Sequence, residues 1–473
     1  MLHLYILFII LTIYLYFKWH LSFFIRKGIV GPSPLPLVGN MWKYITVQKH
    51  FGDVYDKIYQ SYPKAKYVGF YKLHNPAVLV RDLDVVKDVL TGDFSSFQDN
   101  DFVLDPKLDR LSVINPFFAT GEQWKELRSL TTPIFTLSKV RACFPIVEQV
   151  TKTLVEYLSG PEGKNNDINT KTLGEMYTMD VVASAGFSVE GKSFTKEQSP
   201  FRKLVDDLIA PTSSNAFKAF VTLFMPKLAP IFGISFMAPE HESWIRSFVN
   251  QVIERREKLG EKRQDFLQNL LDLQTKHTSL ISDDLVPGQA LVFIAEGSET
   301  SSMLISYSLY ELAKNPDIMH RAQEEIDEIY ERNGGGLTEE GLMQMEYLEQ
   351  ILYETLRMHS VVYSLARKAT KDFTFQPQFS DSNQRLSIPK GTTVIVPVRS
   401  IHYDPAYYPR PNVFDPSRFS EDQKKMRHRY AFLGFGEGPR ICLGLKFALF
   451  QVKAAISSIL RNFDVSLSPK TEQ

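Results

Sequence analysis

Cysteine is scarce and net charge is absent in this sequence of 473 residues. Only Cys143 and Cys442 are present, which excludes a disulfide framework and a zinc site built from cysteines. The 54 lysines and arginines balance 54 aspartates and glutamates, so the basic excess with which a general nucleic-acid binder releases counterions is missing. Internal repeats are also lacking. With 44% apolar and 23% charged residues, the chain has an ordinary globular composition and is long enough to enclose a cofactor.

The N-terminal segment differs from the rest of the chain because it is almost free of charge. Positions 2–17 contain no formally charged residue, although His3 is charged when protonated. After a break at positions 18–20, apolar residues resume at 21–25. A bilayer-spanning helix needs roughly 20 mostly apolar residues, so residues 1–25 are predicted to form a membrane anchor. The alternative is a cleaved signal peptide, which requires a basic first region and a small-residue cleavage site that are not present. Arg26 and Lys27 follow the apolar stretch, which predicts a cytosolic body.

Residues 26–42 are predicted to be a hinge, and residues 43–473 are predicted to form one large, mainly α-helical body with small β-sheets. Three prolines within positions 32–36 favour a stiff, extended segment. The helical period of the apolar residues predicts helices at 84–90, 123–130, 144–158, 245–258, 284–312, 316–331 and 348–358. Short strands are predicted at 66–72, 77–81 and 392–398, the first two joined by a turn at 74–76.

One motif predicts a different class of protein. Residues 186–193 match the nucleotide-binding pattern G-x-x-x-x-G-K-[ST] at every fixed position. A functional P-loop follows a strand and opens directly into a helix, whereas Glu190 would place a carboxylate beside the phosphates and the residues after Ser193 are poor helix formers. A surface loop is therefore the favoured interpretation. A nucleotide-dependent enzyme is the rival, and it predicts binding that Lys192→Ala abolishes.

The most informative segment contains Cys442. Three glycines and a proline within positions 435–444 predict an irregular loop that allows close backbone approach. Positions 445–460 have the period of a helix, so Cys442 is predicted at a helix N-terminus, where the helix dipole favours the thiolate form that binds metals. Arg440 adds a positive charge two residues away. Cys143, in contrast, is interpreted as a small buried hydrophobe.

On these residues the sequence resembles a cytochrome P450. The family's haem signature F-x-x-G-x-R-x-C-x-G is matched at every fixed position, namely Phe435, Gly438, Arg440, Cys442 and Gly444. The resemblance covers the whole chain and is strongest to animal microsomal enzymes, particularly insect families associated with foreign compounds. It implies the mainly α P450 fold and a haem whose iron is bound by the thiolate of Cys442.

Three further signatures of the family occur in the expected order. Glu354 and Arg357 match E-x-x-R, share a helix face and are predicted to form a buried ion pair. Positions 411–419 resemble the segment whose arginine completes that triad. Trp124 and Arg128 lie one helical turn apart on one face, which suits a haem propionate. The resemblance assigns the haem contacts to Trp124, Arg128, Arg367, Arg440, Phe435 and Gly436.

Residues 296–300 lie in the longest predicted helix and resemble the family's oxygen-binding segment A-G-x-[DE]-T. Gly297 would permit a kink over the iron. The resemblance gives Thr300 the hydroxyl that hydrogen-bonds dioxygen and Glu299 the acid that feeds protons, since cleavage of the oxygen–oxygen bond consumes two protons. Thr300 and Glu299 are thus the predicted catalytic residues.

Glu296 departs from the pattern, which has alanine or glycine at its position. It lies one turn before Thr300 on the same helix face and is expected to point toward the haem. One P450 family with a glutamate here forms an ester between it and a haem methyl group, and we hypothesise the same linkage for Glu296. The alternative is a carboxylate that acts in a proton or water network.

The resemblance implies a monooxygenase that inserts one oxygen atom of O2 into lipophilic small molecules, either xenobiotics such as insecticides or endogenous hormones and lipids. It further implies an endoplasmic reticulum location, with electrons supplied from NADPH by NADPH–cytochrome P450 reductase and with cytochrome b5 as a further partner. The basic run 424–429 is a candidate docking patch, with an ordinary solvated charge run as the alternative. Positions 217–237 resemble the mobile roof of the substrate channel, with an ordinary core helix as the alternative.

Two rival functions stay open on the sequence. A P450 that isomerises or dehydrates an oxygenated substrate needs no reductase; the intact Glu299 and Thr300 argue against it, and NADPH dependence of turnover would decide. A haem protein that only sequesters ligands would bind haem without consuming oxygen.

Overall fold

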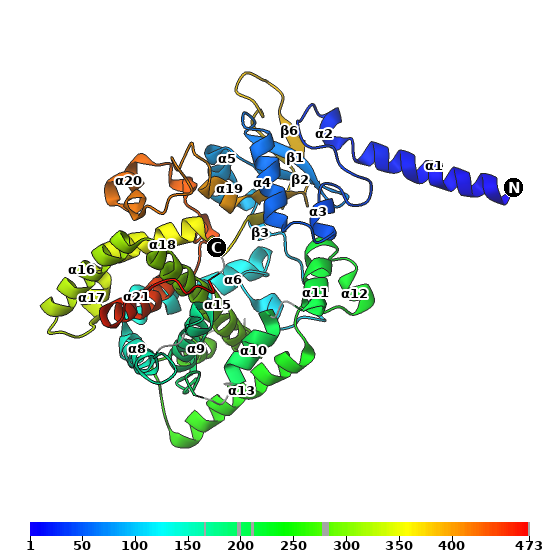
Figure 1. Ribbon diagram of the computed structural model, residues 1–473. Coiled ribbons are helices and arrows are strands. Elements are labelled where there is room, and N and C mark those ends of the chain that lie inside the picture. The colour runs from blue at the N-terminus through cyan, green and yellow to red at the C-terminus, as the bar shows by residue number, and fades with distance from the viewer. Residues whose placement is uncertain (165–166, 196–199, 210–211, 277–282, 472–473) are drawn as a thin grey trace. The chain divides into compact units, whose positions relative to one another are not determined.

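The computed structural model describes residues 1–164, 167–195, 200–209, 212–276 and 283–471. The chain divides into two compact units. The first unit comprises residues 1–103, 362–412 and 425–441, and the second comprises residues 104–361, 413–424 and 442–473. All strands among the described residues belong to the first unit, whereas the second unit is helical (Figure 1).

The first unit contains a five-stranded sheet in the order β1-β2-β7-β4-β3 and a two-stranded sheet of β5 and β6. The strands are β1 (Tyr67–Lys72), β2 (Asn75–Val80), β3 (Asp99–Asn100), β4 (Leu365–Lys368), β5 (Phe373–Phe375), β6 (Leu386–Ile388) and β7 (Thr393–Val396). The helices are α1 (Leu2–His20), α2 (Phe23–Arg26), α3 (Trp42–Ile45), α4 (Phe51–Ser61), α5 (Leu83–Lys87) and α19 (Val398–His402). Short helical turns complete it, namely η1 (Asp88–Gly92), η2 (Phe94–Ser96), η6 (Arg429–Ala431) and η7 (Gly438–Arg440).

The three predicted strands are confirmed as β1, β2 and β7. β1 and β2 form an antiparallel hairpin, and β7 pairs parallel to β2. The hairpin turn lies earlier than predicted, at Leu73 and His74, because Leu73 takes a left-handed φ of 58° and lets β2 begin at Asn75. β4 pairs antiparallel with β7 and with β3, which places Arg367 opposite Asn100.

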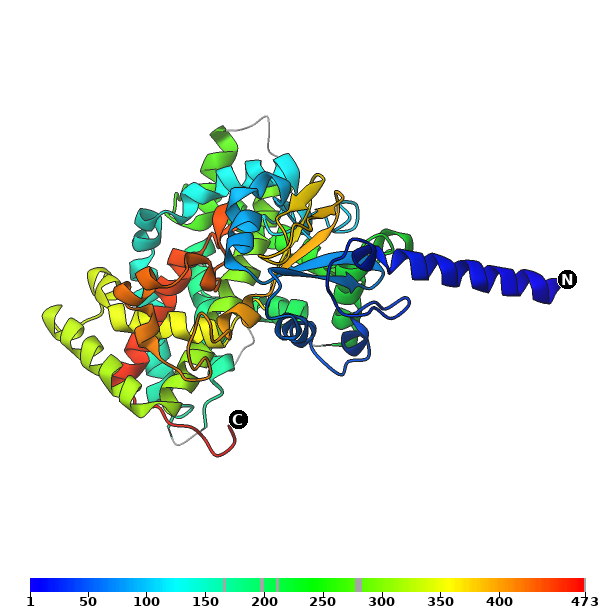
Figure 2. The same cartoon turned by 90° about the horizontal axis from the view of Figure 1, so that it is seen from above.

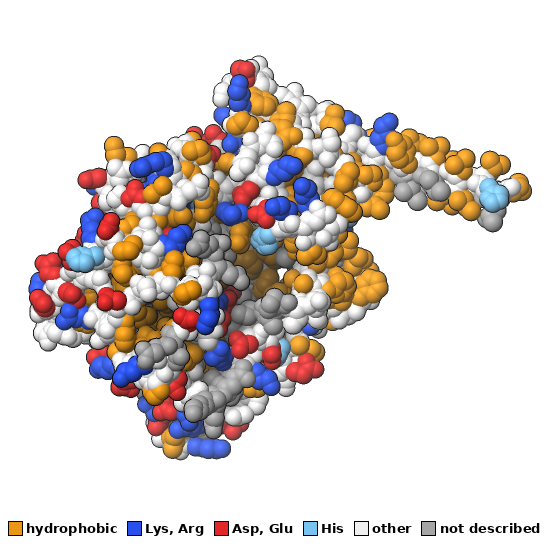
Figure 3. Space-filling model, in the orientation of Figure 1, with side chains coloured by type: hydrophobic (Ala, Val, Ile, Leu, Met, Phe, Trp, Pro, Cys, Tyr) orange, Lys and Arg blue, Asp and Glu red, His pale blue; other side chains and the backbone are white. Residues whose placement is uncertain are grey.

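The apolar N-terminal segment forms α1, but the predicted anchor of residues 1–25 is interrupted. α1 is one helix that is long and apolar enough to cross a membrane by length and composition, and its rise of about 28 Å matches a hydrocarbon core of about 30 Å. Figure 2 shows α1 as a straight rod, and Figure 3 shows mainly apolar colour among its described side chains. The chain turns after His20, and Phe24 of α2 is buried on Gly69 of β1. Leu21 and Phe24 are therefore buried within the first unit, whereas Ile25 is 71% exposed, and α1 ends before this stretch.

The proline-rich segment is docked along the edge of the sheet, in contrast to the predicted extended hinge. The backbone N–H of Gly69 donates to the carbonyl of Val30, and the N–H of Asn40 donates to the carbonyl of Tyr71. Leu35 and Gly39 close a tight turn between these contacts. An edge strand carries unpaired backbone groups, and this segment supplies their partners.

The second unit is built from helices. Its helices before the long central one are α6 (Gly121–Thr131), α7 (Leu137–Ala142), α8 (Phe144–Ser159), α9 (Thr170–Phe187), α10 (Pro200–Ile209), α11 (Ser213–Phe224), α12 (Ala229–Phe232), α13 (Pro239–Leu259) and α14 (Phe266–Lys276). The later ones are α15 (Leu285–Lys314), α16 (Pro316–Arg332), α17 (Glu339–Gln344), α18 (Glu346–Met358) and α21 (Leu445–Asn462), while α20 (Glu421–Met426) crosses the boundary between units. The short turns are η3 (Ser112–Ile114), η4 (Thr132–Phe135) and η5 (Pro416–Phe419). The seven helices predicted from apolar period are confirmed, the first of them as α5 continuing into η1.

α15 is the central helix of the second unit and packs closely against α9. A Cβ at Gly174 of α9 would lie 2.8 Å from the carbonyl oxygen of Ser302, and the hydroxyl of Thr178 donates to the carbonyl of Ser298 at 3.0 Å. α15 continues without a break through Gly297, where a kink was predicted, and a Cβ there would lie 3.2 Å from the side chain of Val182. Close helix packing thus accounts for this glycine.

Residues 186–193 do not form a P-loop. The motif follows the end of α9 rather than a strand, and its Ser188 takes a left-handed φ of 52°. The carboxylate of Asp180 accepts the backbone N–H of Ser193 at 2.9 Å, and a Cβ at Gly191 would lie 2.1 Å from the same oxygen. A carboxylate therefore lies where phosphate would need donors, which argues against the rival nucleotide-binding interpretation. Gly191 and Ser193 are buried, so the loop is not a simple surface loop either.

Candidate functional site

Cys442 precedes α21, and its sulfur faces the start of that helix. The backbone N–H groups of Gly444 and Leu445 donate to the sulfur, an arrangement that favours a thiolate. The side chain is accessible to solvent, yet burial among surrounding protein atoms raises its pKa above the usual value. Glu296 raises and Arg128 lowers the pKa of the same thiol, so both charges act close to the sulfur.

The loop before Cys442 is fixed to the first unit by glycine packing. Gly438 takes a φ of 77°, and a Cβ there would lie 2.1 Å from the carbonyl oxygen of Leu90 in η1. Gly436 has a φ of 72°, another left-handed value that favours glycine. Phe435 is half-buried in the same loop. The glycines of the sequence signature therefore set the backbone path that ends at Cys442.

Two buried arginines of the first unit lie beside β3. The Nε of Arg440 donates to the carbonyl of Gln98, and its guanidinium lies 3.9 Å from Asp99. Arg367, on β4, is 4% exposed and donates to the side-chain oxygen of Asn100 at 2.5 Å. Its Nε is buried without a hydrogen-bond partner, and burial lowers the pKa of Arg367 to about 10. Among the residues that the structure describes, no carboxylate neutralises this guanidinium.

α6 presents Trp124 and Arg128 to one open hollow of about 600 Å³ in the second unit, as the spacing predicts. Trp124 is buried, and burial lowers the pKa of Arg128 while the nearby Cys442 sulfur raises it. A cation and an indole on one face can together bind a carboxylate.

Glu296 and Thr300 interrupt an otherwise buried stretch of α15. Ile294, Ser298 and Ser301 are buried, whereas the side chains of Glu296 and Thr300 are accessible. The Thr300 hydroxyl donates to the backbone carbonyl of Glu296 at 2.9 Å. The side-chain amide of Asn115 donates to Oε1 of Glu296 at 2.6 Å, and burial raises the pKa of Glu296. Glu296 thus lies on the same open helix face as Thr300, as predicted.

Glu299 has a different environment. Its carboxylate accepts a hydrogen bond from the ammonium of Lys171 on α9 at 2.7 Å, and that lysine also contacts Glu175 at 2.8 Å and Ser302 at 3.0 Å. The structure therefore pairs Glu299 with a cation of the neighbouring helix. Among the described residues, the side chains of Glu299 and Thr300 do not hydrogen-bond to each other.

Glu354 and Arg357 form the predicted buried ion pair on α18. The Arg357 Nε lies 2.7 Å and its second donor 2.8 Å from the two carboxylate oxygens, and both side chains have no exposed surface. Arg418 of the 411–419 segment completes the triad, with its Nε 3.4 Å from Glu354. The backbone N–H of Asp415 also donates to Glu354 at 2.9 Å. This cluster ties α18 to the segment that contains η5.

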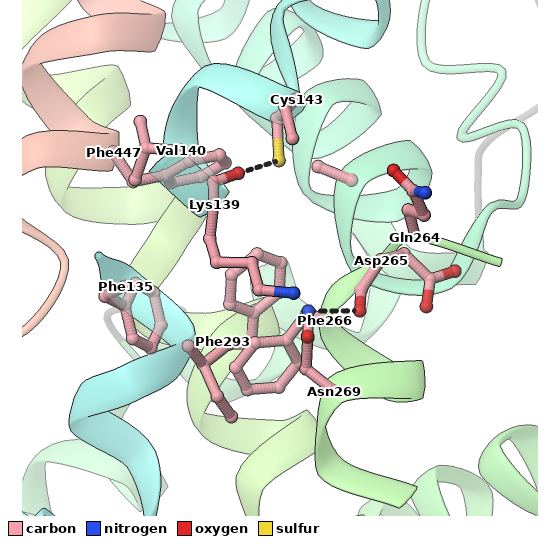
Figure 4. A pocket seen from close by; sticks show the side chains of 13 residues that line it. Phe135, Lys139, Val140, Cys143, Gln264, Asp265, Phe266, Asn269, Phe293 and Phe447 are labelled. Carbon is pink, nitrogen blue, oxygen red and sulfur yellow. Dashed lines mark hydrogen bonds between the residues drawn. The ribbon is translucent and has the colours of Figure 1, made fainter. Parts of the chain in front are cut away.

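A second recess lies elsewhere in the second unit and contains Cys143 (Figure 4). Phe135, Phe266 and Phe293 line it, and the Cys143 thiol donates to the carbonyl of Lys139 at 3.4 Å. Burial raises the pKa of Cys143 to about 11, so it stays a thiol at neutral pH. This agrees with its interpretation as a small hydrophobe rather than a metal ligand.

The predicted site residues fall into two groups. The second unit holds Cys442, Glu296, Glu299, Thr300, Trp124 and Arg128, and the first unit holds Arg367, Arg440, Phe435 and Gly436. Sequence reasoning missed Asn115 and Lys171, which hold Glu296 and Glu299. No local motif marks either residue, because each contacts its partner from a distant part of the chain.

Comparison with known proteins gives consistent results. The Cytochrome P450 family model matches residues 30–473. Cytochrome P450 6j1 of Blattella germanica is 34% identical over 461 residues, which cover 98% of this chain and 91% of that protein. Probable cytochrome P450 6a13 of Drosophila melanogaster is 34% identical over 465 residues, covering 98% and 92%. Cytochrome P450 6B7 of Helicoverpa armigera is 32% identical over 477 residues, also covering 98% and 92%.

Proposed function

This chain belongs to the cytochrome P450 family of haem-thiolate monooxygenases, and on that premise we propose that Cys442 is the thiolate that binds the haem iron. The observation that carries the proposal is the position of Cys442 at the start of α21, where the residue is accessible and its sulfur accepts two backbone N–H groups. Cys143 is a poorer candidate for an iron ligand, because burial raises its pKa to about 11 and keeps it a thiol. Bound haem would supply the oxygen-activating chemistry, with the thiolate favouring oxygen–oxygen cleavage.

The residues present fit a cofactor that carries carboxylates. Arg367 is a buried cation with an unsatisfied Nε, and an unpaired charge in a protein interior is costly. A propionate would supply the missing anion. We therefore propose Arg367, Arg440, Trp124 and Arg128 as the propionate ligands, and Phe435 and Gly436 as further haem contacts.

Thr300 and Glu299 are proposed to hold the protons that the reaction consumes. The Thr300 hydroxyl is accessible on the open face of α15 and can pass a proton to a group bound there. Glu299 is held by Lys171, so proton transfer from its carboxyl requires that this ion pair loosens. The proposed order is therefore from solvent to Glu299 and then to the Thr300 hydroxyl.

Glu296 is proposed to contact the haem directly, because it shares the open face of Thr300 and acts on the Cys442 thiol. An ester to a haem methyl group would be the stronger form of this contact, and its formation would remove two electrons and a proton from that methyl group, with O2 consumed in turnover as the oxidant. Denaturing gel electrophoresis followed by mass spectrometry distinguishes the two forms. If an ester forms, haem stays on the denatured wild-type chain and is released from the denatured Glu296→Gln variant. Release of haem from both denatured proteins would limit Glu296 to hydrogen bonding.

The substrates are proposed to be lipophilic xenobiotics or endogenous hormones and lipids. Support comes from exposed apolar side chains in positions 217–237, where Ile231 is 71% and Phe232 is 70% exposed. The apolar α1 supports attachment to the endoplasmic reticulum membrane, with the body in the cytosol.

The electron donor is proposed to be NADPH–cytochrome P450 reductase, with cytochrome b5 as a second partner. The basic run 424–429 supports an acidic partner, although several of its charges already have contacts. Lys424 pairs with Glu421, and Arg429 pairs with Glu437 at 3.0 Å. Lys425 is exposed and is the first candidate for a docking contact.

The testing experiment is the absorption spectrum of the dithionite-reduced, carbon-monoxide-bound protein, with wild type beside Cys442→Ser. We expect a strongly red-shifted Soret band that the substitution removes. Folded wild-type protein that was supplied with haem and shows no such band would refute the assignment of Cys442. Product formation that depends on NADPH and added reductase would then test the electron source.

A further inference from the structure

A hollow of about 600 Å³ lies on the first unit, and its lining includes none of the residues assigned to haem. It is lined by the proline-rich segment, by α3 and α4, and by Arg399. Figure 3 shows basic side chains over α3 and α4 beside apolar ones. The proposed monooxygenase reaction uses none of these residues.

The acidic side chains that line this hollow are already engaged. Arg399 lies 3.0 Å from Asp53 and 2.9 Å from Asp56. Asp53 also accepts the backbone N–H of His50 at 3.2 Å as part of a helix cap, and Asp56 accepts the hydroxyl of Ser400. Both carboxylates are therefore held by contacts within the unit, although Arg399 supplies only one positive charge for the two of them.

The basic side chains that line the hollow are not engaged in this way. Lys43, Lys49 and Lys57 are exposed, and none of them forms an ion pair with a described residue. These three lysines and Arg399 supply four positive charges against the two carboxylates of Asp53 and Asp56, so the lining of the hollow carries a surplus of two positive charges. Three ammonium groups around one hollow suit an anion with several oxygen atoms.

Apolar side chains project from the same part of the chain. Trp42 is 47%, Leu37 is 64% and Val47 is 90% exposed. Leu37 and Val47 have left-handed φ values of 66° and 57°, which are unfavourable for bulky residues and especially for a β-branched one. Tryptophan and aliphatic side chains beside lysines are typical of a surface that contacts the membrane interface.

The position in the chain also favours a lipid. The hollow begins only a few residues after α1 and α2, the segment that supports membrane attachment. A protein tethered by α1 therefore keeps this part of the first unit close to lipid headgroups. Anionic lipids give the cytosolic leaflet a negative surface potential that attracts basic segments next to a membrane helix.

We propose that this hollow binds the headgroup of an anionic phospholipid. Lys43, Lys49 and Lys57 contact the headgroup oxygens, while Trp42 and Val47 enter the interface. This proposal rests on the proposed membrane attachment through α1. Each lysine near an anionic surface contributes about a five-fold preference, so removal of all three is expected to abolish selectivity.

The test uses full-length, haem-loaded protein in phosphatidylcholine nanodiscs. Two preparations contain the same fraction of brominated lipid, either brominated phosphatidylserine or brominated phosphatidylcholine. Bromine quenches tryptophan on contact, and the difference between wild type and Trp42→Phe isolates the signal of Trp42. We expect quenching of Trp42 to be at least about three-fold stronger with the serine lipid.

A matched pair of triple variants separates the hollow from general charge. The quenching ratio is the quenching of Trp42 by the brominated serine lipid divided by that by the brominated choline lipid. K43Q/K49Q/K57Q should bring this ratio close to one. K87Q/K371Q/K390Q removes the same charge from exposed lysines of the first unit outside the hollow, and it should keep the ratio. A wild-type ratio near one, or a ratio that survives K43Q/K49Q/K57Q, would overturn the proposed lipid site. If the wild type enters nanodiscs of neither lipid, both the membrane attachment and the lipid site are overturned. If it enters both kinds of nanodisc and Trp42 is quenched equally in each, the lipid site alone is overturned.

Discussion

Glu354→Gln is expected to destabilise the second unit more than any other single amide substitution on α18. The carboxylate is fully buried, accepts two hydrogen bonds from Arg357 and one from the backbone of Asp415, and lies beside Arg418. A glutamine keeps the shape but presents one N–H2 group to these donors. Two buried guanidinium groups would then face a neutral side chain, one end of which is itself a donor.

The size of the effect follows from burial. Breaking a buried ion pair by removing one partner costs about 3–5 kcal/mol, because the other charge remains in the interior. The free energy of unfolding of a large protein falls by about 3 kcal/mol per molar urea, so the urea midpoint should fall by about 1–2 M. Arg357→Lys keeps the charge but loses the two-pronged contact, so its shift should be smaller.

The assay is urea unfolding followed by far-ultraviolet circular dichroism, with Glu346→Gln as the control. Glu346 lies on the same helix, is exposed, and forms no ion pair with a described residue, so its change should stay within about 0.5 kcal/mol. The expected order of destabilisation is Glu354→Gln, then Arg357→Lys, then Glu346→Gln. A midpoint for Glu354→Gln that lies within about 0.2 M of the control, a spacing equivalent to about 0.6 kcal/mol, would refute the reasoning.

Three further substitutions test the site and its surroundings. Arg367→Met removes a buried cation that no described carboxylate neutralises, so the haem-free variant should be at least as stable as the haem-free wild type. Transfer of haem from the variant to apomyoglobin should become roughly 10–100-fold faster. Slower unfolding of the variant together with an unchanged rate of haem loss would contradict the propionate assignment. Gly191→Ala should lower the melting temperature because its Cβ would lie 2.1 Å from Asp180, whereas Lys192→Ala should leave the melting temperature and the lack of nucleotide binding unchanged. Burial raises the pKa of Asp180, so the folded state holds this proton more tightly than the unfolded state does, and stability falls as pH rises from about 4 through the raised pKa. Asp180→Asn should flatten this decline when the urea midpoint is plotted against pH. An equal slope of midpoint against pH in both proteins would count against the assignment.

Features that depend on local sequence could be predicted. The apolar period located the amphipathic helices, and the glycine pattern before Cys442 placed that residue at the start of α21. The spacing of Glu354 and Arg357 predicted a shared face, and their burial followed because each neutralises the other. These features involve residues within one turn or one loop.

Features that depend on contacts between distant residues could not be predicted. α9 shows no clear apolar period because almost every side of it is buried, so the sequence offered no signal for a helix face. Lys171 reaches Glu299 across 128 positions, and Asn115 reaches Glu296 across 181. The orientation of both carboxylates is therefore a property of the packed unit and not of the motif that contains them.

The buried arginines of this chain show how counter-ions separate structural from ligand-binding roles. Arg357 has no exposed surface, yet its charge is neutralised by Glu354, which is equally buried, so the pair needs nothing from outside the protein. Arg367 is almost as deeply buried, but it finds only an amide oxygen and a backbone carbonyl, and its Nε is left without a partner. The folded chain alone does not compensate that charge, because neutral acceptors offset only part of the cost of removing a guanidinium from water. A protein that keeps such a residue gains stability when an anion binds beside it, so the proposed propionate contact of Arg367 would couple folding of the first unit to the cofactor.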